Sequence, residues 1–341
     1  GTSMATVVAM KVARDAALDF RSREQGVDQS RLVAYTSAEA HACNARAFDI
    51  LGLGSDALRR IPVDAGFRMD TGALEEAIKA DREAGLRPFA IIGTAGTVNT
   101  GAIDPLQKLA AIASDERLWF HVDGAFAASG QLSERLRDKL SGIERANSLA
   151  FDFHKWLHVN YDAGFVLVRD GELHRRSFSS RPDYLKGTIR GLAAGDPWPV
   201  EYGPELSRGF RALKVWAHIT EFGPSRLGQA IGMNCQLADT LAGLVDGSED
   251  LERLSPVETC ICCLRYVPAG GEPINLNALN EEIVTRLHES GIAAPSTTRI
   301  HGKLAIRVNM TNHRTRESDL HVLLDAVRAL APGAIEAVQQ A

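Results

Sequence analysis

Short apolar runs and longer amphipathic stretches alternate along the first half of the chain. The apolar runs predict strands at 32–35, 60–63, 88–93, 118–122, 148–151 and 164–168. Hydrophobic residues at helical spacing predict helices at 7–20, 41–51, 72–84 and 105–113. The run at 88–93 is apolar throughout, as expected for a strand covered on both faces. This alternation predicts an α/β fold built on a doubly wound, mainly parallel sheet, in which ligands bind beyond the carboxyl ends of the strands.

The second half of the chain has a different pattern. Residues 180–203 are rich in Gly and Pro and predict a loop long enough to act as a lid. Helices are expected to resume near Glu205 and to run to about Leu244. Further strands are expected at 259–267 and 304–309, and further helices at 276–289 and 317–329. We therefore predict a large domain over 1–203, connecting helices over 204–250 and a small C-terminal α/β domain over 251–341.

Composition narrows the possible functions. The 341 residues carry a net charge of −5, which argues against a nucleic-acid or anionic-membrane partner. No apolar run reaches the roughly 18 residues of a membrane span, and the first residues do not have the pattern of a signal peptide. Three of the five cysteines fall in 259–264 without a matching Cys or His pair. We therefore expect buried thiols in a reducing cytoplasm and no metal site.

Two of the predicted strands are followed by residues with complementary chemistry. Asp123 follows one strand, and Lys155 follows another in a His-Lys-Trp turn. A carboxylate and an amine at one sheet edge suit pyridoxal 5′-phosphate (PLP). The lysine would form a Schiff base with the aldehyde, and the aspartate would hold a proton on the pyridine nitrogen. A helix-capping Asp and a solvated Lys are the alternatives, but His121, His154 and Trp156 beside them favour a site.

A series of short motifs, in chain order, resembles the group II PLP-dependent amino-acid decarboxylases, which include the aromatic-amino-acid and glutamate decarboxylases. The motifs are 1–5 (GTSMA), 40–41 (AH), 93–97 (GTAGT) with 101–105 (GAIDP), 121–125 (HVDGA), 154–156 (HKW), 182–186 (PDYLK) and 206–214 (LSRGFRALK). The resemblance covers residues 1 to about 330 and implies fold type I, the fold of aspartate aminotransferase. The family has a long segment before its Gly-Thr-Ser turn, so the chain is expected to be truncated at its N-terminus.

The resemblance also implies roles for individual residues around the cofactor. Thr2 and Ser3 would bind the phosphate at a helix N-terminus, where Ser3 is also the expected N-cap. His41 would stack on the pyridine ring and touch the substrate carboxylate, although a surface position for it is equally open. The remaining expected contacts are Thr97 beside the cofactor, Ala125 against the second ring face, and His154 at the phosphate.

Asp152 departs from the usual pattern before the His-Lys pair, because Phe153 follows it where the family commonly has Pro or Ala. An anionic side chain near a phosphate would repel it. Asp152 is therefore expected to point away from the phosphate or to pair with a base.

Three further residues bear on the reaction and on assembly. Tyr184 would protonate the carbon left after CO₂ departs, unless it only packs the loop onto the body. Ser207 and Arg208 would reach the cofactor of a neighbouring subunit, which implies a homodimer with a composite active site, although Arg208 could instead lie on a helix surface. Arg307 ends a small-domain strand, where other enzymes of this fold bind the substrate carboxylate, and a role for it here ranks low.

The expected activity is α-decarboxylation of an L-amino acid, with an aromatic substrate favoured, to an amine and CO₂. Two alternatives stay open. One is an aldehyde synthase or another PLP lyase on the same fold, a class that tends to have Phe in place of Tyr184. The other is a catalytically incompetent fragment or partner subunit. The identity of the amino acid is left open by the sequence.

Overall fold

Six strands form the larger sheet of the computed structural model, which describes residues 1–27, 30–180, 190–191, 195, 197–270 and 274–340. The strand order is β2-β1-β3-β4-β5-β6, and every neighbouring pair is parallel except β5 and β6. The strands are β1 (Leu32–Ser37), β2 (Leu58–Ile61), β3 (Arg87–Thr94), β4 (Trp119–Asp123), β5 (Ser148–Asp152) and β6 (Gly164–Val168). This arrangement confirms the predicted α/β, mainly parallel sheet.

Helices cover the two faces of this sheet because successive residues of each strand point to opposite sides. Val33 and Ile91 pack with α4 (Thr71–Glu83) and α5 (Leu106–Asp115), whereas Ala34 and Ile92 pack with α1 and α3. Helix α1 (Thr2–Ala17) begins at the edge of the sheet where β5 ends. The other helices of this half are α2 (Ser22–Gln25), α3 (Cys43–Ile50), α6 (Glu134–Arg137) and α7 (Gly171–Phe178).

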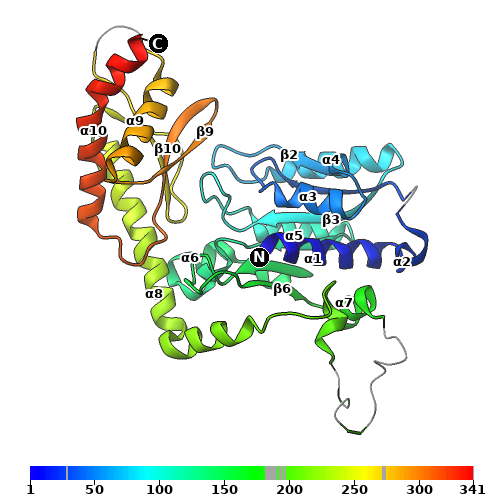
Figure 1. The fold of residues 1–341 in the computed structure, drawn as a ribbon. Helices are drawn as coiled ribbons and strands as arrows, with labels where there is room; N and C mark the ends of the chain where they lie inside the picture. The colour runs from blue at the N-terminus through cyan, green and yellow to red at the C-terminus, as the bar shows by residue number, and fades with distance from the viewer. Residues whose placement is uncertain (28–29, 181–189, 192–194, 196, 271–273, 341) are drawn as a thin grey trace.

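A long helix, α8 (Ala212–Asp246), leads from the large sheet to a smaller antiparallel sheet (Figure 1). The helix is kinked at Gly223, with φ 70° and ψ 158°, directly before Pro224. The smaller sheet has the order β7-β8-β10-β9. Its elements are β7 (Leu251–Arg253), β8 (Ile261–Tyr266), β9 (Ser296–Ile300), β10 (Lys303–Asn309), α9 (Leu276–Ser290) and α10 (Glu317–Gln340).

The structure corrects two sequence predictions. Residues 205–211 are irregular, so the helix expected to resume near Glu205 begins only at Ala212. Ser3 lies inside α1 rather than at its N-cap, which is Gly1. The Asp152 carboxylate accepts the hydrogen bond of the first helical N–H, that of Thr2, at 2.8 Å. The strands β7 and β9 and the helix α7 were not expected.

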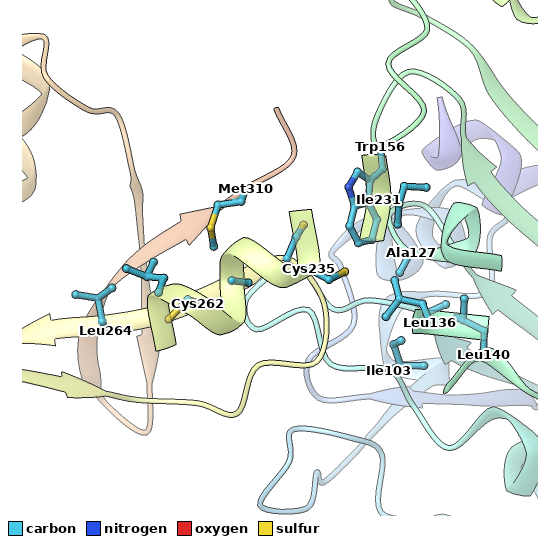
Figure 2. Packing of buried hydrophobic residues seen from close by; sticks show 14 of the residues in the cluster. Ile103, Ala127, Leu136, Leu140, Trp156, Ile231, Cys235, Cys262, Leu264 and Met310 are labelled. Atoms are coloured by element: carbon cyan, nitrogen blue, oxygen red, sulfur yellow. The ribbon is translucent and has the colours of Figure 1, made fainter. Parts of the chain in front are cut away.

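One hydrophobic core runs from the large sheet through α8 into the small sheet (Figure 2). Trp156 and Ile231 lie on one side of Cys235, and Cys262 and Met310 lie on the other. The indole of Trp156 stacks on Phe126 and donates a hydrogen bond to Asn234 of α8 at 3.0 Å. All five cysteines are buried and unpaired, as predicted. In the described ranges, no helix is both long and apolar enough to span a membrane.

Candidate active site

A cavity of about 620 Å³ opens where β3, β4 and β5 end and α1 begins. It brings together most of the residues that the sequence predicted for the site: Thr2, Ser3, His41, Thr97, Asp123, Ala125, His154 and Lys155. Arg307, Asn309 and Thr311 line its small-domain side. A second cavity of about 720 Å³, mostly apolar, lies beside β5, β6 and α8 and contains none of these residues. The convergence of titratable groups therefore selects the first cavity.

Asp123 ends β4 on the face that α1 and α3 cover, and it is only 3% exposed. Asn44 donates a hydrogen bond to its Oδ2 at 3.3 Å, and the backbone N–H of Ala125 donates to Oδ1 at 3.2 Å. The Cys43 sulfur lies 3.9 Å from the same Oδ2. Burial and the Asp123 charge raise the pKa of the Cys43 thiol to about 12, so the thiol stays protonated and faces the carboxylate as a donor.

Lys155 lies in the turn after β5, with its Nζ 3.1 Å from Oδ2 of Asp152. The other oxygen of Asp152 accepts the Thr2 N–H, so this carboxylate connects the lysine to the start of α1. Asp152 therefore pairs with a base and does not point away from the helix, which decides between the two predicted arrangements. Next to it, His154 accepts the Ala163 N–H at Nδ1, which leaves Nε2 as the protonated nitrogen.

The cavity suits an anion at one end and a protonated nitrogen at the other. Its anion end is the first turn of α1, where backbone N–H groups and the helix dipole attract negative charge. The Thr2 hydroxyl is buried at this turn, and the Thr94 hydroxyl is buried at the residue that pairs with Asp123 across β3 and β4. Neither hydroxyl has a hydrogen-bond partner among the described residues. Asp123 supplies the carboxylate at the other end. This donor set fits a phosphorylated pyridine aldehyde, with the charge of Asp152 as the one feature that opposes it.

Two of the residues that were predicted to contact the cofactor make hydrogen bonds within the protein, Thr97 and His41. The Thr97 hydroxyl lies 3.0 Å from that of Thr100 and accepts the Ala102 N–H at 3.1 Å, so it shapes the turn after β3. His41 is exposed to solvent and also lines the cavity, and its Nδ1 accepts the Cys43 N–H at 3.1 Å. His41 is therefore a surface residue that also lines the cavity, and its stacking on the pyridine ring stays a prediction.

The remaining predicted residues are Ser207, Arg208, Tyr184 and Arg307. Ser207 and Arg208 are exposed and do not line this cavity, and Arg208 pairs with Glu205 at 3.2 Å. Tyr184 and the rest of its motif lie outside the described residues. Arg307 does reach the cavity, but its Nε donates to the Val98 carbonyl at 2.8 Å. Burial lowers its pKa.

Some lining residues were not expected from the sequence. They are Cys43, Phe126, Tyr161, Asn309 and Thr311. Asn44 does not line the cavity, but it donates a hydrogen bond to Asp123. A sequence signal exists for some of them, because Cys43 and Asn44 open the helix that follows His41, and Thr311 follows the strand that carries Arg307.

Comparison with known proteins agrees with this geometry. Residues 1–267 match the pyridoxal-dependent decarboxylase conserved domain. The chain belongs to the pyridoxal-dependent decarboxylase family. It is 36% identical to the aromatic-L-amino-acid decarboxylase of Bacillus atrophaeus, over 97% of this chain and 68% of that protein. It is 31% identical to a phenylacetaldehyde synthase of Arabidopsis thaliana, over 89% of this chain and 62% of that protein.

A solved structure extends the family assignment to the fold and the cofactor. The structure of Oryza sativa TDC with PLP and tryptamine superposes with a TM-score of 0.88 at 28% identity, over 98% of this chain and 69% of that one. Fold type I and dependence on pyridoxal phosphate are properties of the family, and the chain shares them as a member. The chain spans between 57% and 68% of the length of the curated relatives it matches.

Proposed function

We propose that the chain catalyses the PLP-dependent α-decarboxylation of an L-amino acid, with an aromatic amino acid favoured, to an amine and CO₂. The observation that carries this proposal is that Asp123 and Lys155 line one cavity at the carboxyl ends of neighbouring strands, beside the N-terminus of α1. Similarity to an aromatic-L-amino-acid decarboxylase supports the aromatic preference.

Each residue of the site would have a defined task. PLP, when bound, supplies a conjugated ring that accepts the electron pair left at Cα as CO₂ departs. Lys155 would attach the aldehyde through Nζ and give way to the substrate amine. Asp123 would hold a proton on the ring nitrogen, while His41 would cover one ring face and Ala125 the other. Tyr184 would return a proton to Cα.

The test is release of labelled CO₂ from carboxyl-labelled L-tryptophan, L-tyrosine, L-phenylalanine and L-glutamate by the 341-residue chain with added PLP. Lys155→Ala should reduce the rate by about 10⁴-fold, because no other amine can replace the one that holds the aldehyde. Lys108→Ala, which changes an exposed lysine of α5, is the matched control and should keep the rate. A Lys155→Ala variant with normal turnover would refute the proposed chemistry.

An aldehyde synthase is the second candidate, because the chain is also similar to a phenylacetaldehyde synthase. Tyr184 argues for the decarboxylase, since a phenol can protonate Cα and Phe cannot. Ammonia and peroxide assays separate the two reactions. A decarboxylase yields an amine and CO₂, and neither ammonia nor peroxide is a main product.

We infer that the working enzyme is a homodimer, in which Ser207 and Arg208 reach the partner's cofactor. Support comes from an exposed apolar stretch that surrounds them and continues into α8, formed by Leu206, Phe210, Leu213 and Trp216. Light scattering together with PLP titration tests this. A monomer that cannot hold PLP would instead favour a catalytically incompetent fragment.

A further inference from the structure

The turn that carries Lys155 also contains a histidine to which the proposed reaction gives no task. His158 is half-buried and adopts a left-handed backbone conformation, with φ 60°. Such a conformation costs free energy for a residue with a Cβ, and it persists where the surrounding contacts hold it. The His158 N–H donates to the Lys155 carbonyl at 3.1 Å, so the backbone joins the two residues directly.

The imidazole of His158 bonds to the opposite wall of the cavity. Its Nε2 lies 2.7 Å from the backbone oxygen of Thr311, which lies two residues after β10 and lines the cavity on the small-domain side. A carbonyl oxygen can only accept, so the hydrogen of this bond lies on Nε2. The ring of His158 also packs edge-on against that of His313, with the ring centroids 5.0 Å apart.

Trp156 makes a second connection from the same turn. Its indole donates to Asn234 of α8 at 3.0 Å, and Asn234 donates to the carbonyl of Asn312 at 3.2 Å. Trp156 and Asn234 are each only 1% exposed, so water does not compete for the bond between them. All three residues at 311–313 are therefore contacted from this turn, either directly or through Asn234.

We propose that His158 is a positioning residue: its bond to the Thr311 carbonyl sets the separation between Lys155 and the small-domain wall of the cavity. A substrate held at Lys155 would fill this separation. Asp152 and the first turn of α1 hold the lysine from the phosphate end, and their contacts do not involve His158. Loss of the bond should therefore weaken substrate binding more than PLP binding. The inference rests on the proposed role of Lys155.

Hydrogen exchange of the 341-residue chain without cofactor, read by mass spectrometry, tests the connection itself. His158→Asn loses the bond, because the shorter amide does not reach Thr311, while Asn tolerates the left-handed conformation. Exchange should speed up about tenfold in both 153–161 and 308–313 and stay unchanged in β3. His158→Gln keeps an N–H at the reach of Nε2 and should stay within about threefold of the unmodified chain in both segments.

His301→Asn is the matched control for this substitution. His301 is also left-handed, with φ 49°, but it is exposed in the turn between β9 and β10, so its replacement should change neither segment. Unchanged exchange at 308–313 in His158→Asn would overturn the proposal. An equal increase in β3 would also overturn it, because the substitution would then have loosened the whole domain.

A second measurement separates positioning from cofactor binding. In the chain with PLP, the substrate is the amino acid that gives the fastest release of labelled CO₂. His158→Asn should raise its KM about tenfold, while the Kd of PLP from fluorescence titration stays within about threefold. An equal rise in both constants, or in neither, would overturn the positioning role. A chain that binds PLP but turns over no amino acid would refute the proposed function and leave the exchange result to decide.

Discussion

Asp152 places a negative charge at the start of α1, where the site otherwise attracts anions. Its carboxylate accepts the Thr2 N–H and pairs with Lys155 at 3.1 Å, so the two charges offset each other. A phosphate binding at the same helix turn meets this charge in a buried position, where charges are weakly screened. Asp152 therefore balances two effects, capping the helix and opposing the phosphate.

Asp152→Asn should bind PLP about tenfold more tightly, because the amide oxygen can still accept the Thr2 N–H while the repulsion of the phosphate disappears. Fluorescence titration of the two proteins measures the change. Asp115→Asn, at an exposed position ending α5, removes the same charge far from the cavity and should leave the affinity unchanged. Weaker binding by Asp152→Asn would mean that its hold on Lys155 matters more than its repulsion.

At the residue scale, the sequence predicts the groups whose chemistry is local and misses those whose role depends on packing. Asp123 and Lys155 are recognisable because each follows a strand and carries the charge a PLP site needs. Cys43 and Asn44 open the helix that follows His41, but their contact with Asp123 could not be predicted, because it depends on how α3 lies against β4. His121 was noticed, but its hydrogen bond with Ser148 requires the register of β4 and β5.

At the scale of elements, the kink of α8 depends on one backbone conformation. Gly223 has φ 70° and ψ 158°, a region that is essentially restricted to glycine. A Cβ at this position would meet no neighbouring atom within 4 Å. A side chain here would therefore destabilise the protein through the backbone conformation that it must adopt and not through a clash.

Gly223→Ala should lower the free energy of unfolding by about 1–3 kcal/mol, measured by urea denaturation. Gly243→Ala, in the regular part of the same helix with equally open surroundings, should raise it by about 0.5–1 kcal/mol. Equal effects of the two substitutions would show that the kink is not held by the conformation of Gly223.

Asp104 joins the end of β3 to the segment before α4. Its two oxygens accept the N–H groups of Met69 and Thr94, and its complete burial raises its pKa to about 7. The unfolded carboxyl has a pKa of about 3.9, so the folded state binds the proton more tightly. The stabilising contribution of this group is therefore complete below about pH 4 and is lost as the pH rises to 7.

The free energy of unfolding should fall between pH 5 and pH 8 by more in the unmodified chain than in Asp104→Asn, which has no proton to lose. Urea titrations of both proteins at the two pH values measure this difference. Identical pH dependence of the two proteins would contradict a raised pKa for Asp104.

Among the elements, long periodic segments were predicted well and short polar ones were not. The strands of the large sheet follow from apolar runs that both faces bury. The edge strands β7 and β9 are short or polar and carry no such pattern. The start of α8 was misplaced because residues 205–211 have a helix-compatible composition but irregular backbone.

At the scale of the whole molecule, Asn99 connects the small sheet to the site. Its side chain accepts a hydrogen bond from Thr298 of β9 at 2.7 Å and donates to Glu39, just before His41, at 2.8 Å. Its carbonyl accepts from Arg307 of β10 at 3.1 Å. These partners lie up to 208 residues from Asn99 in the sequence, so local patterns could not reveal the connection.

Asn99→Ala should lower the free energy of unfolding by about 1–3 kcal/mol, because two partly buried groups lose their partner. Hydrogen exchange should speed up around Glu39 and in β9, and urea denaturation gives the overall cost. Asn160→Ala, at an exposed position, is the matched control and should change neither. Unchanged exchange around Glu39 in Asn99→Ala would show that Asn99 does not link the two regions.

The buried thiols have a practical consequence at this scale. Cys43 lies beneath the site, Cys235 lies in α8, and the other three cysteines lie in or beside β8. An alkylating reagent can reach Cys235 and the three thiols in or beside β8 only when their surroundings open, whereas Cys43 lines the cavity and can be met from it. Mass spectrometry of brief iodoacetamide labelling would therefore time the opening around α8 and β8 in one unmutated protein. Labelling of the β8 group ahead of Cys235 would mean that residues 251–341 loosen before α8 does.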